Sequence, residues 1–266
     1  MKTAFLGSGN MARAIIGGMV KTGTAPADLL VVNPGNPKSC GEVQALYGAV
    51  PTQPEGLSQA DVVVLAFKPQ TFPDAAPVYR PVIREDALVV SIMAGVSIGS
   101  IEAALGAKKV VRVMPNLAHA VGKGASGYAM GSGVSEGDAR IVEEMLSASG
   151  AVVRVEERQI NDVGALSGSG PAYICLLLEA LCDAAVQDGM DPATAAILAK
   201  QTLLGTAALL EQEDLPPQEL RRRVTSKKGT TEAAINAMCA MQFPQAVQAG
   251  YEANKRRSEA LAAESL

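Results

Sequence analysis

The sequence predicts an α/β protein in which a doubly wound, mainly parallel β-sheet is followed by an all-α helical domain. Three observations predict this fold class. From Met1 to about Glu157, short runs of Val, Ile and Leu, typical of strands covered on both faces, alternate with amphipathic stretches. After Gln159 the strand-like runs stop, and Ala- and Leu-rich helical patterns take their place. We therefore expect two domains, at 1–158 and 159–266.

The same patterns place the elements of the first domain. Strands are predicted at 3–7, 29–33, 61–67, 87–93, 108–114, 127–131 and 151–155. Amphipathic helices are predicted between them, at 10–22, 37–47, 70–80, 97–104 and 136–148. This alternation predicts helices on both faces of the sheet.

The second domain is predicted to be a helix bundle. Its helices are expected at 160–188, with a break or kink at 168–171, and at 191–211, 217–223, 230–241 and 244–263. The first of them contains "PAYICLLLEALCDAAV" and is apolar nearly all round, and so few helices cannot cover one another completely. We expect a homodimer that forms through this domain; burial of the helix inside its own monomer is the alternative.

The composition argues against several classes of protein. Of the 266 residues, 48% are hydrophobic and 19% are charged, which is typical of a soluble globular chain. The net charge of −4 argues against a nucleic-acid partner, because it provides no general basic surface for phosphates. We identify no export signal and no apolar run close to the ~20 residues that a membrane helix needs. We therefore expect a cytoplasmic protein with a small-molecule substrate and no membrane partner.

The four cysteines, Cys40, Cys175, Cys182 and Cys239, form no C-x-x-C pair, and His119 is the only histidine. We therefore expect no zinc site and no other bound metal. We predict reduced, mostly buried thiols. Cys175 and Cys182 lie two helical turns apart on one face, which indicates core packing.

A glycine motif follows the first predicted strand. Gly7, Gly9 and Ala12 have the spacing G-x-G-x-x-A between a strand and a helix, as in dinucleotide-binding sites. Gly7 would form the tight turn, Gly9 would let the backbone approach the pyrophosphate, and Ala12 would keep helix and strand close. Free N–H groups at the helix start favour phosphates. We assign this loop, with Asn10 and Met11, to a cofactor; a purely structural turn is the alternative.

The end of the second predicted strand bears on the choice of cofactor. NAD sites place Asp or Glu there to bind the ribose 2′-OH, and that carboxylate would repel a 2′-phosphate. This chain has Asn33, an amide that accepts either cofactor, so we expect NADPH, with NADH as the alternative. Asn36 and Lys38 are candidates to bind the 2′-phosphate. Turn chemistry beside the neighbouring prolines would also explain both asparagines.

Five further stretches carry a resemblance to a known family. They are "VVVLAFKPQ" (62–70), "SIMAGVSI" (91–98), "VRVMPNLAHAVGKGAS" (111–126), "ALSGSGPAYICLLLEAL" (165–181) and "VTSKKGTTEAAI" (224–235). With the glycine loop, and over essentially the whole chain, they closely resemble the Δ1-pyrroline-5-carboxylate reductases; the last two stretches are much more specific than the glycine loop. The resemblance implies a Rossmann domain, an intertwined helical dimerisation domain and, in many members, a ring of five dimers. It also implies that NAD(P)H reduces the cyclic imine of (S)-1-pyrroline-5-carboxylate to L-proline, the last step of proline biosynthesis.

The resemblance assigns site residues motif by motif. The cofactor would be flanked by Lys68 and Pro69, and the nicotinamide pocket would be lined by Ala94 and Gly95, then by Met114, Pro115 and Asn116. The substrate loop would contain Ser226, Gly229, Thr230 and Thr231. Family members commonly have T-S-P-G-G-T-T there, whereas this chain has Lys227 and Lys228 in place of Pro-Gly, a departure that bears on the conformation of the loop. We expect these two lysines to be a solvated pair.

Reduction of an imine needs little acid catalysis, because a protonated C=N is already electrophilic. What it needs is orientation of the reacting atoms at about 3–3.5 Å. We assign the substrate carboxylate to the amides of Gly229 and Thr230, assisted by Ser226, and the substrate nitrogen to the Thr231 hydroxyl, the candidate catalytic group. Helix capping by either threonine is the structural alternative. We expect His119 to be a polar loop residue near the cofactor rather than a proton donor.

Three other functions are considered. A β-hydroxyacid dehydrogenase would share the architecture, but those enzymes resemble one another in a catalytic lysine on the interdomain helix, and 160–188 contains no lysine. An imine reductase for another cyclic imino acid remains open, since one methylene changes discrimination by only ~1–3 kcal/mol. A non-catalytic NADP(H)-binding sensor also remains open, because fold does not imply function.

Overall fold

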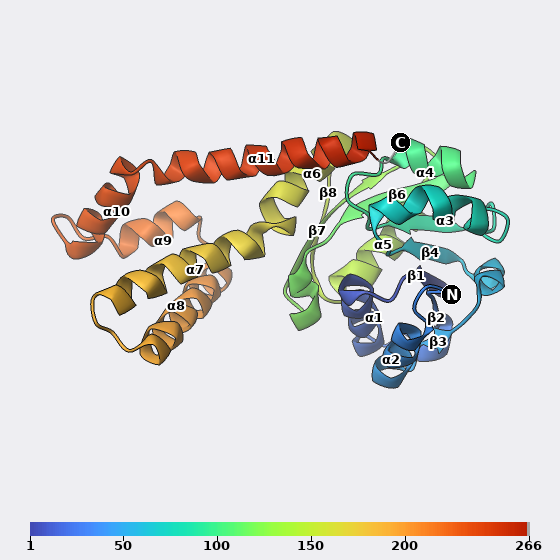
Figure 1. Ribbon diagram of the computed structural model, residues 1–266, viewed down its shortest axis with the longest axis horizontal. Helices are drawn as coiled ribbons and strands as arrows, with labels where there is room; N and C mark the ends of the chain where they lie inside the picture. The colour runs from blue at the N-terminus through green and yellow to red at the C-terminus, as the bar shows by residue number, and fades with distance from the viewer. Residues whose placement is uncertain (265–266) are drawn as a thin grey trace. The chain divides into compact units, whose positions relative to one another are not determined.

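A computed structural model describes residues 1–264 and confirms the predicted architecture, a mainly parallel sheet followed by helices (Figure 1). By its internal contacts the chain divides into two units. One contains residues 1–171 together with the chain from Glu252 onward, and the other contains residues 172–251. The first unit holds the sheet, and the second is helical.

One sheet of eight strands forms the centre of the first unit. The strands are β1 (Thr3–Leu6), β2 (Leu29–Val32), β3 (Val50–Pro51), β4 (Val62–Leu65), β5 (Leu88–Ser91), β6 (Lys109–Met114), β7 (Gly124–Met130) and β8 (Gly150–Arg154). Their order is β3-β2-β1-β4-β5-β6-β7-β8, and within it the β6–β7 pair is antiparallel. The first six have the order of a doubly wound dinucleotide-binding sheet, which reverses between β1 and β4. Thr3 pairs with Leu29 of β2 and with Val62 of β4, so these three strands end at one edge.

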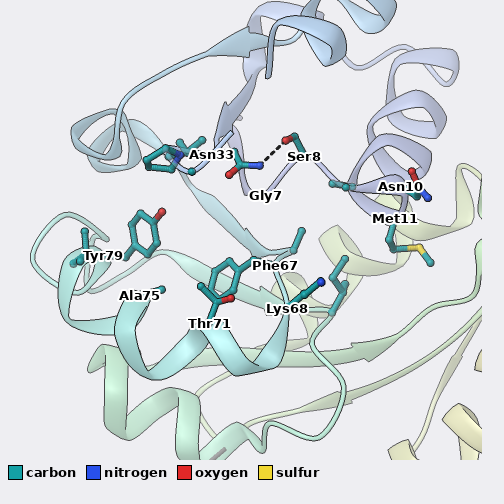
Figure 2. Close-up of a pocket in the computed structure, with 18 residues that line it drawn as sticks. Gly7, Ser8, Asn10, Met11, Asn33, Phe67, Lys68, Thr71, Ala75 and Tyr79 are labelled. Carbon is teal, nitrogen blue, oxygen red and sulfur yellow. Dashed lines mark hydrogen bonds between the residues drawn. The ribbon is translucent and has the colours of Figure 1, made fainter. Parts of the chain in front are cut away.

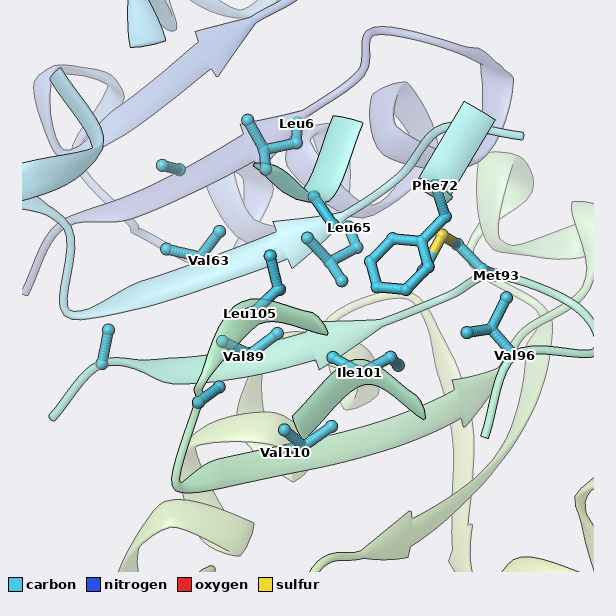
Figure 3. Close-up of a cluster of buried hydrophobic side chains, with 14 of the residues drawn as sticks. Leu6, Val63, Leu65, Phe72, Val89, Met93, Val96, Ile101, Leu105 and Val110 are labelled. Atoms are coloured by element: carbon cyan, nitrogen blue, oxygen red, sulfur yellow. The ribbon is translucent and has the colours of Figure 1, made fainter. Parts of the chain in front are cut away.

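Helices cover both faces of this sheet, close to the predicted bounds. They are α1 (Asn10–Lys21), α2 (Pro37–Tyr47), α3 (Phe72–Tyr79), α4 (Ile98–Leu105) and α5 (Glu136–Ser147). One apolar cluster joins α3 and α4 to strand residues such as Leu6 and Val89 (Figure 3). The other joins α1, α2 and α5 to residues such as Phe5. Phe5 and Leu6 face opposite clusters because successive side chains of a strand point to opposite faces.

Two strands depart from the sequence patterns. β3 (Val50–Pro51) was not predicted; it is short and lies at the sheet edge, where a proline without an N–H is tolerated. β7 begins at Gly124, earlier than the predicted start at 127, because pairing with its neighbours extends it through "GASG", a segment without strong strand propensity.

The described chain after β8 is helical, as predicted. Its elements are α6 (Ile160–Val163), the π-turn η6 (Gly164–Gly168), α7 (Gly170–Gln187), α8 (Pro192–Glu213), α9 (Pro217–Arg223), α10 (Thr230–Ala240) and α11 (Phe243–Glu264). The break expected at 168–171 is thus a π-turn that begins a few residues earlier, at Gly164. The Asp191 side chain caps α8 by accepting a hydrogen bond from the Thr194 N–H at 2.9 Å, and Pro192 follows it.

The helices α7 and α8 expose apolar side chains within a single chain. Leu176 of α7 is 65% exposed and Ile197 of α8 is 68% exposed. None of the described residues of α7 is buried, so the alternative of burial inside the monomer is wrong. The helical stretches 157–187 and 192–213 are also long and apolar enough to cross a membrane, by length and composition alone, although no apolar run of that length was expected.

The prediction of mostly buried thiols was wrong. Cys40 is buried in the sheet-containing unit, but Cys175 and Cys239 are exposed and Cys182 is half-buried; all four are free. The spacing of Cys175 and Cys182 identified a common helix face correctly. That face has no cover within one chain, which is why the thiols are accessible there.

His119 is buried, at 2% exposure, and differs in this from the polar loop residue that we expected. Its two ring nitrogens lie 2.7 Å from the hydroxyls of Ser149 and Ser126. The backbone of Gly124 packs directly against the imidazole ring, since a Cβ at Gly124 would lie 2.3 Å from a ring carbon. Burial lowers the pKa of His119. The histidine therefore ties the turn η4 (Leu117–Val121) to β7 and to the start of β8.

Replacing His119 by Gln should flatten the pH dependence of stability. Because the folded-state pKa is depressed below the ordinary ~6.5, the unfolded chain takes up a proton that the folded chain does not. This contribution to stability is full above that pH and is lost as the pH falls. Between about pH 7.5 and about pH 5.5, the melting temperature of the native protein should therefore drop more than that of H119Q. An equal drop in melting temperature with pH in the two proteins would contradict this assignment.

Candidate functional site

A pocket of about 730 Å³ opens beyond the carboxyl ends of β1, β2 and β4, where the sheet order reverses (Figure 2). Open α/β sheets bind ligands at this position. The pocket is lined by six of the predicted cofactor residues, Gly7, Gly9, Asn10, Met11, Asn33 and Lys68. It is also lined by residues that the motifs did not single out, among them Ser8, Pro34, Gly35, Phe67, Thr71, Val78 and Tyr79.

The two glycines of the motif are required for different reasons. Gly7 has a φ of +113°, and a Cβ there would lie 2.3 Å from the carbonyl oxygen of Ala66. Gly9 is the N-cap residue of α1 and has an extended conformation. No atom lies within 4 Å of the position that a Cβ at Gly9 would take. Gly7 therefore serves the packing of the turn, whereas Gly9 leaves open space before the N–H groups of α1.

Asn33 is held in place by the glycine loop. Its Nδ2 donates to the Ser8 hydroxyl at 2.8 Å, and that hydroxyl donates to the Ser39 Oγ at 2.7 Å. Asn36 caps α2 by accepting from the Ser39 N–H at 3.2 Å, as turn chemistry predicts, and Lys38 is exposed. Among the described residues that line the pocket there is no Asp or Glu. The pocket wall therefore offers no carboxylate that would repel a 2′-phosphate.

Arg13 is a neighbour of this network that sequence reasoning missed. Its Nε donates to the Ser8 carbonyl at 2.9 Å, and one terminal nitrogen donates to Ser39 Oγ at 3.0 Å and to Glu42 Oε2 at 2.6 Å. The hydrogen bond from Arg13 lowers the pKa of Glu42. This arginine comes from α1, which precedes Asn33 in the chain. No local pattern signals it, because folding brings α1 and α2 together.

The opposite side of the pocket is aromatic. Figure 2 shows Phe67, Thr71 and Tyr79 across from Ser8 and Asn33. The rings of Phe67 and Tyr79 stack with centroids 6.4 Å apart. Burial raises the pKa of Tyr79, so its hydroxyl stays protonated near neutral pH. This wall provides flat apolar surface of the kind that stacks against a base.

The other predicted cofactor residues lie outside this set of lining residues. Pro69 begins the short turn after β4. Ala94 and Gly95 follow β5, and Gly95 has a φ of +80°. The triplet Met114, Pro115 and Asn116 lies at the end of β6, with its last two residues buried. Because β5 and β6 are parallel to β4, these segments reach the same edge of the sheet as the glycine loop.

The predicted substrate loop precedes α10 in the second unit. Gly229 is the N-cap of α10, so neither Thr230 nor Thr231 occupies the cap position. The Ser226 Oγ would be 2.3 Å from a Cβ at Gly229, so the hydroxyl lies directly against the glycine. The Gly229 N–H donates to the Ser226 carbonyl at 3.0 Å. In this conformation the amide of Gly229, which we assigned to a substrate carboxylate, is therefore already used.

The two lysines that depart from the family pattern are exposed. Lys228 has a φ of +60°, a left-handed conformation that favours the glycine found at this place in the family. Its N–H donates to Glu232 Oε2 at 2.7 Å. The chain thus keeps a glycine-type turn with a lysine in it, at a cost of roughly 1–2 kcal/mol.

Comparison with known proteins gives one consistent result. Residues 157–261 match the family described as pyrroline-5-carboxylate reductase dimerisation, and residues 2–95 match the family described as NADP oxidoreductase coenzyme F420-dependent. The pyrroline-5-carboxylate reductase of Pseudomonas aeruginosa is 40% identical over 98% of this chain and 97% of its own. Pyrroline-5-carboxylate reductase 2 of Bacillus subtilis is 36% identical over 97% and 94%.

Solved structures agree with these relatives. A pyrroline-5-carboxylate reductase from Coxiella burnetii has a TM-score of 0.91 at 35% identity, over 98% of both chains. The pyrroline carboxylate reductase of Plasmodium falciparum, solved with NADP bound, has a TM-score of 0.86 at 27% identity, also over 98% of both chains.

Alanine substitution should separate the roles of the two glycines. Gly7→Ala should destabilise the fold by about 1–3 kcal/mol, because the residue is left-handed and its Cβ would meet Ala66. Gly9→Ala should leave the melting temperature nearly unchanged but weaken dinucleotide binding at least roughly tenfold, because its methyl group takes the space before the helix start. Thermal melts and fluorescence titration with NADPH measure the two effects. Equal losses of stability in both variants would refute this division.

Proposed function

The chain belongs to the pyrroline-5-carboxylate reductase family, and on this premise we propose that it reduces (S)-1-pyrroline-5-carboxylate to L-proline with NADPH. The reaction is the last step of proline biosynthesis. The observation that carries the proposal is 40% identity to a named reductase along nearly the whole of both chains. We assign the cofactor to the pocket at the sheet reversal and the substrate to the loop before α10.

The pocket residues fit a dinucleotide phosphate. Gly9 leaves space beside the free N–H groups of α1, and those groups with the helix dipole attract a pyrophosphate. Lys68 adds a cation on the pocket rim. NADPH is favoured over NADH because Asn33 replaces a carboxylate and because the Plasmodium falciparum relative binds NADP. When bound, the cofactor supplies the hydride for the imine carbon.

We assign the substrate to the loop before α10. The unpaired N–H groups of the first turn of α10 suit its carboxylate, with Thr230 and the Ser226 hydroxyl as the first contacts. The Gly229 amide would join them if its bond to Ser226 opened. The Thr231 hydroxyl, which does not cap the helix, is assigned to the nitrogen of the protonated imine, whose positive charge is neutralised as the carbon gains hydride.

The chain forms a homo-oligomer through its helical part, as the match to a dimerisation family indicates. We propose a homodimer that covers the apolar faces of α7 and α8, and a ring of five such dimers as the family resemblance implies. A partner subunit covers these faces without requiring a bilayer. Four free cysteines support a cytoplasmic location, where thiols stay reduced.

The proposal is tested by following NADPH absorbance with and without pyrroline-5-carboxylate. We expect oxidation that depends on the substrate, yields L-proline and is slower with NADH. A sensor would bind NADPH without consuming it. A reductase for a different cyclic imino acid would turn over the six-membered homologue faster than pyrroline-5-carboxylate.

Thr231→Ala should lower kcat/KM roughly tenfold to a hundredfold, or about 1.5–3 kcal/mol, if its hydroxyl bonds a nitrogen that is charged or becoming charged. Thr231→Ser keeps the hydroxyl and should retain most of the activity. Size-exclusion chromatography and thermal melts establish that both variants are folded and assembled. Full activity in folded T231A would remove this role from the threonine.

A further inference from the structure

The π-turn η6 interrupts the long helical stretch after β8, and the proposed reaction gives it no role. In it the Ser169 N–H donates to the Gly164 carbonyl at 2.9 Å. A π-turn interrupts the regular ladder of a helix and is frequent at functional sites. The helix α6 before it packs on β6 and β7, where a Cβ at Gly127 would lie 2.5 Å from Val163.

The first contact of η6 is a hydrogen bond to Asn116. This residue is only 8% exposed, and its Nδ2 donates to the Ser167 carbonyl at 3.1 Å. Its Oδ1 accepts from the Ala125 N–H at 3.0 Å. Both ends of the side-chain amide therefore bind protein groups. Asn116 was predicted to line the nicotinamide pocket, but these bonds make it a link between the end of β6, β7 and η6.

The second contact is between Met114 and the glycines of η6. A Cβ at Gly164 would lie 2.6 Å from Met114 Cε, so the thioether end rests directly on this glycine. A Cβ at Gly168 would lie 3.8 Å from the same atom, an ordinary contact distance. A methyl group at Gly164 would therefore push the terminal methyl of Met114 aside, whereas one at Gly168 would not.

The residues on either flank of η6 are tied to α11. Lys255 of α11 forms an ion pair with Asp162, just before η6. Asn254 Nδ2 donates to the Ser169 hydroxyl at 2.8 Å. Because η6 is held at its flanks as well, it can serve as a fixed support for the segment 114–116.

We propose that η6 positions the segment 114–116, the predicted nicotinamide wall, through the Asn116–Ser167 hydrogen bond and the Met114–Gly164 contact. Met114 and Asn116 are then positioning residues for hydride transfer. The inference rests on the proposed function, since it gives the wall a nicotinamide to orient. Loss of either contact would misplace the ring relative to the imine without weakening the phosphate contacts at the glycine loop.

The test compares Gly164→Ala with the matched control Gly168→Ala. In G164A we expect faster amide hydrogen exchange at 111–117 without any cofactor, and a kcat reduced roughly tenfold or more. We also expect a larger isotope effect with NADPH deuterated at C4, because hydride transfer becomes rate-limiting, and an NADPH dissociation constant within about twofold of the native value. G168A should match the native protein in all four measurements.

Asn116→Asp is the second variant, since it keeps the acceptor for Ala125 but loses the donor to Ser167. It should speed exchange at both 111–117 and 163–170. Native exchange at 111–117 in both G164A and N116D would overturn the inference. So would a loss of kcat in proportion to unfolded protein with an unchanged isotope effect. Absence of turnover in the native enzyme would instead refute the proposed function, while the exchange measurements would still decide whether η6 holds the wall.

Discussion

The close approach of Gly7 to the end of β4 is the constraint on which the pocket depends. A side chain at Gly7 would collide with the Ala66 carbonyl, so the first turn can cross the reversal point of the sheet only as glycine. With the turn in this position, α1 begins directly above the ends of β1 and β4. The loops after three parallel strands then converge at one edge, and Asn33 reaches Ser8 from the neighbouring loop. The hydrogen bond between Asn33 and Ser8 thus depends on the backbone conformation of the glycine turn.

Hydrophobic periodicity predicted the longer helices and every described strand except the short edge strand β3, because periodicity is a local property of the chain. The glycine loop, Asn33 and Lys68 could be predicted as pocket residues because parallel strands bring their carboxyl ends to one edge. Arg13 and the stacked rings of Phe67 and Tyr79 could not be predicted. Their positions depend on how α1 and α3 pack on the sheet, which no single stretch of sequence encodes.

The helical half shows a different limit. The sequence pattern of α7 and α8 predicted their apolar faces correctly. A pattern does not show which surface covers such a face, and the prediction that most cysteines are buried was therefore wrong. The break in the long helix was predictable from Gly and Ser residues. That the break is a π-turn could not be predicted, because the π-turn coincides with tertiary contacts to Asn116 and Met114.

In the proposed homodimer, the apolar faces of α7 and α8 make the stability of the protein depend on its concentration. Apolar area that is removed from water only on association contributes at about 25 cal/mol per Å² to the assembled state and nothing to the isolated chain. In that homodimer, side chains such as Leu176 and Ile197 would place part of the folding free energy in a bimolecular step. Dilution then favours dissociation and lowers the stability of each chain. A newly synthesised chain must associate with a second chain before its exposed apolar helices bind other surfaces.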